Sequence, residues 1–193
     1  MDIEKLEQII KLHLSDKRFN HVKNVAEEAV RLAAKYGVDV EKARIAGLLH
    51  DITKEFEKEE HLYLFNQAML KLDPIEAKME KVWHPISGAI YAEKVLDIKD
   101  QDILNAIRYH LTGRIGMSKL EKIIFVADYT SCERNFDGVD KIRYEVDRSL
   151  ERGVVEEMKF TLPKLISLES PICEDGWKAY NYYVALKNKG ERL

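Results

Sequence analysis

Apolar residues recur three and four positions apart over most of this 193-residue chain. That spacing places them on one face of a helix, whereas the alternating pattern of strands is weak throughout. We find neither an internal repeat nor a linker long enough to separate domains. The chain is therefore predicted to be all-α, a single-domain helical bundle over residues 1–193. The expected helices cover residues 2–14, 18–36, 39–49, 57–70, a segment that begins at Pro74, 84–96, 100–110, 118 to beyond 128, 139–169 and 175–187.

Finer expectations concern single residues. Within 139–169, Gly153 is expected to break the helix, and Pro163 to kink it or end it. The last helix is expected to end before Gly190. His13 and His61 belong to no motif and are expected at the surface.

Charge and hydropathy exclude several classes of function. The net charge is −3, so no overall positive field would attract nucleic acid. The uncharged stretch 82–92 is far shorter than the roughly 20 residues of a membrane-spanning helix. The N-terminus does not look like a signal peptide, and the two cysteines, Cys132 and Cys173, are not in a CxxC arrangement. We expect a cytoplasmic protein that binds neither nucleic acid nor membrane.

Potential metal ligands lie in apolar, helix-like stretches rather than on charged surface segments. A single His-Asp pair has an ordinary interpretation, a helix end whose histidine favours the helix dipole. Several such residues together are harder to explain, because a buried carboxylate within Ile123–Asp128 needs a cation as partner. The candidates are His21, His50, Asp51, His84, His110 and Asp128.

These ligand types indicate the chemistry. Imidazole and carboxylate without thiolate suit iron, manganese, zinc or magnesium-type hydrolytic sites. Asp51 has two oxygens and can bridge two ions, which would activate water near neutral pH and neutralise a phosphoryl group. The sequence thus predicts metal-assisted hydrolysis at phosphorus.

Four ordered motifs then make the prediction specific; they are residues 48–54 (LLHDITK), 83–89 (WHPISGA), 109–113 (YHLTG) and 127–129 (ADY). Together they resemble the HD-domain phosphohydrolase superfamily and, within it, the YqeK-type symmetrical bis(5'-nucleosyl)-tetraphosphatases, which cut diadenosine tetraphosphate into two ADP. The likeness runs from about residue 18 to residue 143. Helices at about 139–190 agree in length and polarity only and are expected to pack on that core.

The resemblance implies roles for individual residues. His21, His50, Asp51 and Asp128 would hold a first iron, while His84 and His110 would complete a second metal site or face the substrate phosphates. One or two iron ions are expected; manganese, cobalt or another divalent metal is the alternative. Asp51, His84, His110 and Lys54 are the catalytic candidates.

The resemblance also implies substrate contacts. Lys54 would pair with a phosphate, and Thr112 and Gly113 would approach phosphate with hydroxyl and backbone N–H groups. Arg134 matches a phosphate-facing arginine, and Asp128 is grouped with these substrate residues. Two alternatives stay open: Lys54 as a solvated lysine, and Arg134 in a surface ion pair with Glu133 or Asp137.

Two departures from the branch bear on the nucleotide. Leu111 replaces the first of two threonines, and Thr130-Ser131-Cys132 replaces Ile-Glu-Pro. The alternative functions are therefore a nucleotidase or nucleoside triphosphatase, or a non-catalytic nucleotide-binding regulator. The apolar C-terminal helices could serve the core or a homodimer contact. Their tyrosines are expected in the core, with stacking on a base as the alternative: Tyr180, Tyr182 and Tyr183.

Overall fold

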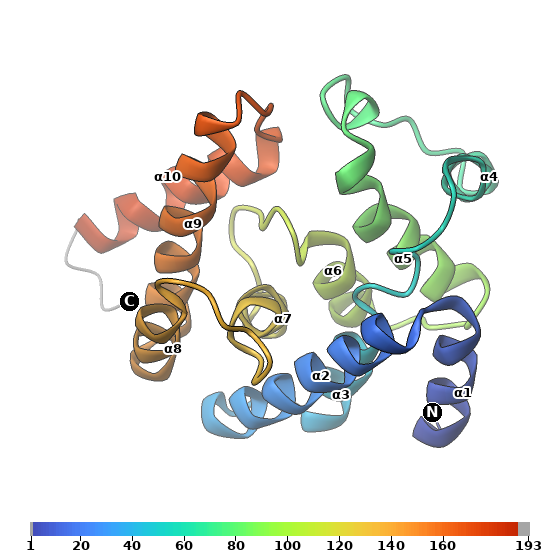
Figure 1. Cartoon of the computed structure of the whole chain (residues 1–193), viewed down its shortest axis with the longest axis horizontal. Helices are drawn as coiled ribbons and strands as arrows, with labels where there is room; N and C mark the ends of the chain where they lie inside the picture. The colour runs from blue at the N-terminus through green and yellow to red at the C-terminus, as the bar shows by residue number, and fades with distance from the viewer. Residues whose placement is uncertain (1, 189–193) are drawn as a thin grey trace.

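The computed structural model describes residues 2–188, and over that range it contains helices and no strand (Figure 1). This confirms the predicted all-α class. Ten α-helices and two short 3-10 helices follow one another along the described chain. They are α1 (Ile3–His13), α2 (Asp16–Tyr36), α3 (Val40–Leu49), α4 (Lys58–Gln67), η1 (Glu76–Lys78), η2 (Glu80–Val82), α5 (Trp83–Lys94), α6 (Gln101–Tyr109), α7 (Lys119–Thr130), α8 (Val139–Arg148), α9 (Leu150–Ser167) and α10 (Glu174–Asn188).

Capping residues explain where the helices that carry the site begin and end. The Asp39 carboxylate accepts the Glu41 amide at 2.9 Å and starts α3. Gly37 ends α2 in the left-handed conformation, with φ at 67°, which glycine adopts without strain. Ser118 and Glu121 form a capping box at the start of α7.

The centre of the bundle is formed by α6 and α7 (Figure 1). Helix α2 packs along α3 and α7, and α6 packs against α3, α5 and α7. Gly47 of α3 permits the close approach of α2, because a Cβ atom there would lie 2.7 Å from the Ala26 Cα of α2. The C-terminal helices α8, α9 and α10 flank α7 on the side away from α4 and α5 (Figure 1).

The predicted break at Gly153 is wrong. The chain breaks at Ser149, which is extended and caps α9, whereas Gly153 lies inside α9. A Cβ atom at Gly153 would lie 2.3 Å from Val146 Cγ2, so glycine serves here to bring α8 close to α9. Pro163 is not a boundary either, because α9 continues to Ser167. The predicted end before Gly190 lies outside the described residues.

The surface position predicted for His61 is also wrong. His61 is buried, and its Nδ1 lies 2.7 Å from the hydroxyl of Ser87. His13 is half-buried and meets the hydroxyl of Tyr91 at 2.8 Å. The core expectation holds for Tyr183, which is 1% exposed and accepts the Met117 amide. Within residues 2–188, none of the helices combines the length and the apolar character that crossing a bilayer requires.

Candidate metal centre

The six predicted ligands converge on one buried point from five helices. His21 comes from the first half of α2, and His50 and Asp51 follow the end of α3. His84 lies in the first turn of α5, His110 directly after α6, and Asp128 near the end of α7. All are buried, and they form three overlapping groups whose ligand atoms lie within 4.8 Å of one another: His21–His50–Asp51, His50–His110–Asp128 and Asp51–His84–His110.

The same local hydrogen bond, from the ring to a backbone carbonyl oxygen, orients three of the histidines. The ring Nδ1 lies at hydrogen-bond distance from the carbonyl oxygen three residues earlier: Gly47 for His50 (2.7 Å), Lys81 for His84 (3.0 Å) and Ile107 for His110 (2.8 Å). A carbonyl oxygen only accepts, so Nδ1 must carry the hydrogen. The neutral ring then presents the Nε2 lone pair to the cluster, the tautomer that a metal ligand needs.

His21 reaches the same orientation through a distant side chain. Its Nδ1 lies 2.6 Å from Oε1 of Glu133, in the loop after α7, and its Nε2 lies 3.0 Å from Oδ1 of Asp128. Ser131 also donates its hydroxyl to Glu133, at 3.0 Å. The departure at residues 130–132 is therefore followed directly by Glu133, whose carboxylate contacts both Ser131 and His21.

The two oxygens of Asp51 face different histidines. Oδ2 lies 3.9 Å from Nε2 of His21 and 3.6 Å from Nε2 of His50. Oδ1 lies 3.2 Å from Nε2 of His84 and 3.6 Å from Nε2 of His110. This is the arrangement expected of a carboxylate that can bridge two ions.

Burial keeps two of these rings neutral. It lowers the pKa of His50 to about 4 and of His84 to about 3, against the charge of Asp51. At Asp51 burial acts in the opposite direction, but the neighbouring His50, His110 and His84 together hold its pKa well below the usual range. Burial likewise opposes the charge on Asp128, while His21, His50 and Arg134 lower its pKa. The centre thus places the carboxylates of Asp51 and Asp128 among imidazoles of which two, His50 and His84, stay neutral.

The donor set fits a divalent cation. The buried Nε2 of His50 has no hydrogen-bond partner in the part of the chain that the structure describes. The Nε2 atoms of His84 and His110 lie 3.3 Å apart, and two lone pairs at that distance repel unless a cation or proton faces them. None of the three groups contains a thiolate. The site therefore suits a hydrolytic iron, manganese or zinc ion more than the zinc of a structural zinc finger.

Cationic side chains border the centre. Arg18 donates from Nη1 to Oδ2 of Asp51 at 2.9 Å. Arg134 donates from Nε to the Asp128 carbonyl oxygen at 2.6 Å and also pairs with the Asp128 carboxylate. Lys54 Nζ lies 3.2 Å from Nε2 of His84, so it faces the centre rather than bulk solvent. The alternative of an Arg134 pair with Glu133 or Asp137 is not what the structure shows.

In the loop after His110, the two residues predicted to contact phosphate already use their hydrogen-bond donors on nearby backbone carbonyl oxygens. Thr112 is half-buried and donates its hydroxyl to the Gly113 carbonyl oxygen at 3.0 Å. The Gly113 amide already donates to the Tyr109 carbonyl oxygen at 2.8 Å, as part of the turn that ends α6. With that donor in use, a phosphate contact from the Gly113 amide stays a prediction. Its φ of 65° fits a glycine turn.

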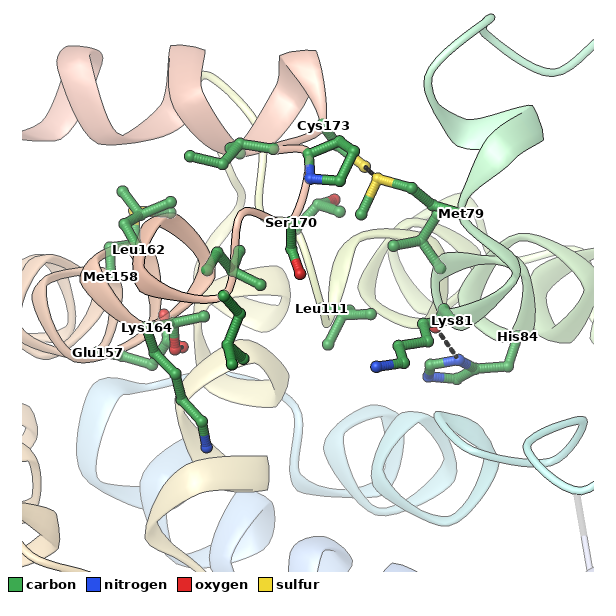
Figure 2. A pocket seen from close by; sticks show the side chains of 18 of the residues that line it. Met79, Lys81, His84, Leu111, Glu157, Met158, Leu162, Lys164, Ser170 and Cys173 are labelled. Atoms are coloured by element: carbon green, nitrogen blue, oxygen red, sulfur yellow. Dashed lines mark hydrogen bonds between the residues drawn. The ribbon is translucent and has the colours of Figure 1, made fainter.

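A pocket of about 660 Å³ opens beside the centre (Figure 2). Lys54, His84 and Thr112 are among its lining residues, so it is continuous with the centre. The rest of the lining comes from the η1–η2 region, α7, α9 and the α9–α10 connection, and is largely apolar. Its volume falls within the roughly 300–1,000 Å³ typical of small-molecule sites.

Sequence reasoning missed three features of this site. Arg18 could have been found, because it lies three residues before His21 and hence on the same face of α2. Glu133 could not, because its partner His21 is 112 residues away. The pocket also depends on contacts between remote helices, including the wall that contains Glu157.

An all-helical fold that gathers four histidines and two aspartates at one buried point, beside cations and a pocket, is typical of metal-dependent phosphohydrolases. The model of the HD domain matches residues 18–132. The chain belongs to the HD-domain family.

Similar proteins lie in the same family. Two relatives named "Bis(5'-nucleosyl)-tetraphosphatase, symmetrical" are 37% identical (Halalkalibacterium halodurans; 90% of this chain, 92% of the relative) and 34% identical (Bacillus subtilis; 96% and 99%). A crystal structure from Clostridium acetobutylicum, described as a predicted HD superfamily hydrolase involved in NAD metabolism, is 36% identical. It has a TM-score of 0.92 and covers 96% of this chain and 98% of its own.

Proposed function

We propose that this protein hydrolyses diadenosine tetraphosphate and related dinucleoside tetraphosphates at the central phosphoanhydride, giving two ADP. The observation that carries the proposal is Asp51, whose two oxygens face His21 and His50 on one side and His84 and His110 on the other. The named relatives over nearly the whole chain support the choice of substrate.

His21, His50, Asp51 and Asp128 are proposed to hold one ion, and His84 and His110, with Asp51, a second. Iron is the proposed metal, with manganese or cobalt as substitutes. When bound, the metal supplies Lewis acidity at the phosphoryl oxygens and lowers the pKa of a water molecule.

The chain's own residues position the substrate and balance its charge. Hydrolysis adds one water across the central P–O–P linkage, so one bridging bond breaks and one ADP departs as an anion. Lys54 and Arg134 stabilise the negative charge that gathers on the phosphoryl and leaving oxygens. Arg18 joins them, because its guanidinium already reaches Asp51 and is only partly exposed. Thr112 lines the pocket, and its hydroxyl would donate to a phosphate oxygen in place of the Gly113 carbonyl oxygen.

Product analysis tests the proposal. Protein prepared without oxygen and supplied with iron is incubated with diadenosine tetraphosphate, and the nucleotides are separated by chromatography. We expect ADP alone, at two per substrate consumed. ATP with AMP would contradict cleavage at the central linkage. Turnover of ATP or AMP but not of the dinucleotide would favour the nucleoside triphosphatase or nucleotidase, and binding without turnover the non-catalytic regulator.

A further inference from the structure

The pocket beside the centre contains a deeply buried carboxyl group that the proposed hydrolysis leaves unused. Glu157, on α9, lies in the pocket wall and is 2% exposed. Figure 2 shows it beside Met158, across the pocket from His84. Its nearest polar partner is the hydroxyl of Thr161, which donates to Oε1. A buried carboxyl costs free energy that an apolar side chain at the same place would avoid.

The walls around Glu157 suit a flat, largely apolar group. Sulfur and aliphatic side chains dominate the lining, with the ring of Phe125 from α7. His84, Lys54 and Thr112 line the same pocket, and these are the residues proposed to face phosphate. A nucleotide whose phosphates lie at the centre would therefore extend its nucleoside into this space.

We propose that this pocket is the subsite for one purine nucleoside of the substrate, and that Glu157 recognises its base. The inference rests on the proposed hydrolysis only in taking a nucleotide as the ligand. The N7 edge of adenine offers one donor and one acceptor, whereas that of guanine offers two acceptors. A neutral carboxyl group has one donor and one acceptor and therefore matches adenine.

The surroundings of Glu157 keep it neutral. Burial raises its pKa to about 8, assisted by the charge of Asp128 and opposed by hydrogen bonds with Thr161 and Tyr129. The Thr161 hydroxyl donates to one lone pair of the Glu157 carbonyl oxygen, which leaves the second lone pair free to accept from the amino group of adenine. The acidic hydrogen is then available to a ring nitrogen of the base.

Variants of Glu157 test the recognition. Glutamine has the same donor and acceptor pair, as in its known pairing with adenine, while leucine has neither. KM is measured for diadenosine and diguanosine tetraphosphates with wild type, Glu157→Gln and Glu157→Leu. We expect the wild type to prefer the adenine substrate and Glu157→Gln to keep most of that preference. Glu157→Leu should lose the preference, because its KM for the adenine substrate should rise about tenfold. A wild type without preference, or a Leu variant that keeps it, overturns the role of Glu157.

A blocking variant tests the subsite itself. Leu162→Trp fills the pocket, and Ile166→Trp, an exposed site on the same helix outside the lining, is the matched control. Calorimetry with ADP and with pyrophosphate separates the two parts of the ligand. We expect ADP to bind roughly tenfold more tightly than pyrophosphate in wild type and control, and equally in Leu162→Trp. Circular dichroism and thermal unfolding check that the variants fold.

The two hypotheses fail in different ways. Equal binding of ADP and pyrophosphate by wild type, or an ADP advantage that survives Leu162→Trp, would overturn the subsite even in an active enzyme. A protein that binds ADP as expected but releases no ADP from any dinucleoside tetraphosphate would overturn the proposed reaction instead.

Discussion

Each histidine of the centre is held by a hydrogen bond on the side away from the cluster, and only one of these bonds is made by a side chain. The carbonyl partners of His50, His84 and His110 are parts of the backbone and survive any single substitution. Glu133 is different, because its 2.6 Å contact with Nδ1 of His21 can be removed. Such outer partners fix the tautomer of a ligand and raise its basicity.

Replacing Glu133 by Ala is expected to weaken metal binding by roughly 10- to 100-fold, and Gln, which can still accept the hydrogen bond, by less. The measurement is the amount of metal that each variant retains per chain after competition with a chelator. Asp137→Ala is the control, because Asp137 is an exposed acid in the same loop. Thermal unfolding of the metal-free proteins should be alike. Unchanged metal affinity in Glu133→Ala would show that Glu133 does not position His21.

Stability should depend on pH through Glu157. Its folded pKa of about 8 lies above the ordinary value of 4.5, so the folded state retains a proton that the unfolded state releases. The contribution of this group is therefore most favourable below about pH 4.5 and is lost as the pH rises through 8. Glu157→Gln should gain stability relative to wild type between pH 5 and 8, by at most roughly 1.4 kcal/mol per pH unit. Urea unfolding of both metal-free proteins measures this difference, and a constant difference would contradict it.

At the scale of elements, close helix approaches set the geometry of the bundle. Gly153 brings α9 against Val146 of α8, and Gly47 brings α3 against Ala26 of α2. The second approach matters for the site, because α2 carries His21 and His50 directly follows α3.

Gly153→Ala tests this packing. Alanine favours a helix interior by roughly 1 kcal/mol over glycine, yet its Cβ would lie 2.3 Å from Val146 Cγ2. We expect the overlap to outweigh the gain and lower the free energy of unfolding by about 1–3 kcal/mol. Gly88→Ala is the comparison, because its Cβ meets a side-chain methyl of Ile107 at 3.3 Å, which can move. Greater stability of Gly153→Ala than of the wild type would contradict the close contact between Gly153 and Val146 as the reason for glycine at this position.

Most helices could be predicted because periodicity and caps are local: Asp39, Asp100 and Ser118 each begin a helix, as their types suggest. Gly153 was misread because a glycine in a helical pattern is compatible with a break or with a close contact, and only Val146 distinguishes them. The ligands could be predicted to gather because burial of His and Asp demands a partner. Arg18 lies on the same face of α2 as His21, so its spacing could have indicated it, whereas Glu133 contacts His21 across 112 residues of chain, which periodicity does not describe.

At the scale of the whole molecule, the candidate metal centre and the pocket beside it draw on different parts of the chain. The HD-domain match ends at residue 132 and contains all six candidate ligands of the centre. A large part of the pocket wall comes from α9 and the α9–α10 connection, beyond that match (Figure 2). If this pocket binds the substrate, as we propose, substitutions in α9 and the α9–α10 connection should change KM more than metal content.

The central claim is that the cluster around Asp51 holds the metal on which hydrolysis depends. Metal-free wild type and Asp51→Asn are titrated with Fe²⁺ without oxygen, and metal per chain and ADP from diadenosine tetraphosphate are measured on the same samples. We predict that ADP formation by wild type rises in proportion to bound iron, while Asp51→Asn binds less iron and forms almost no ADP. Full turnover by the metal-free protein, or full activity and iron content in Asp51→Asn, would contradict the claim.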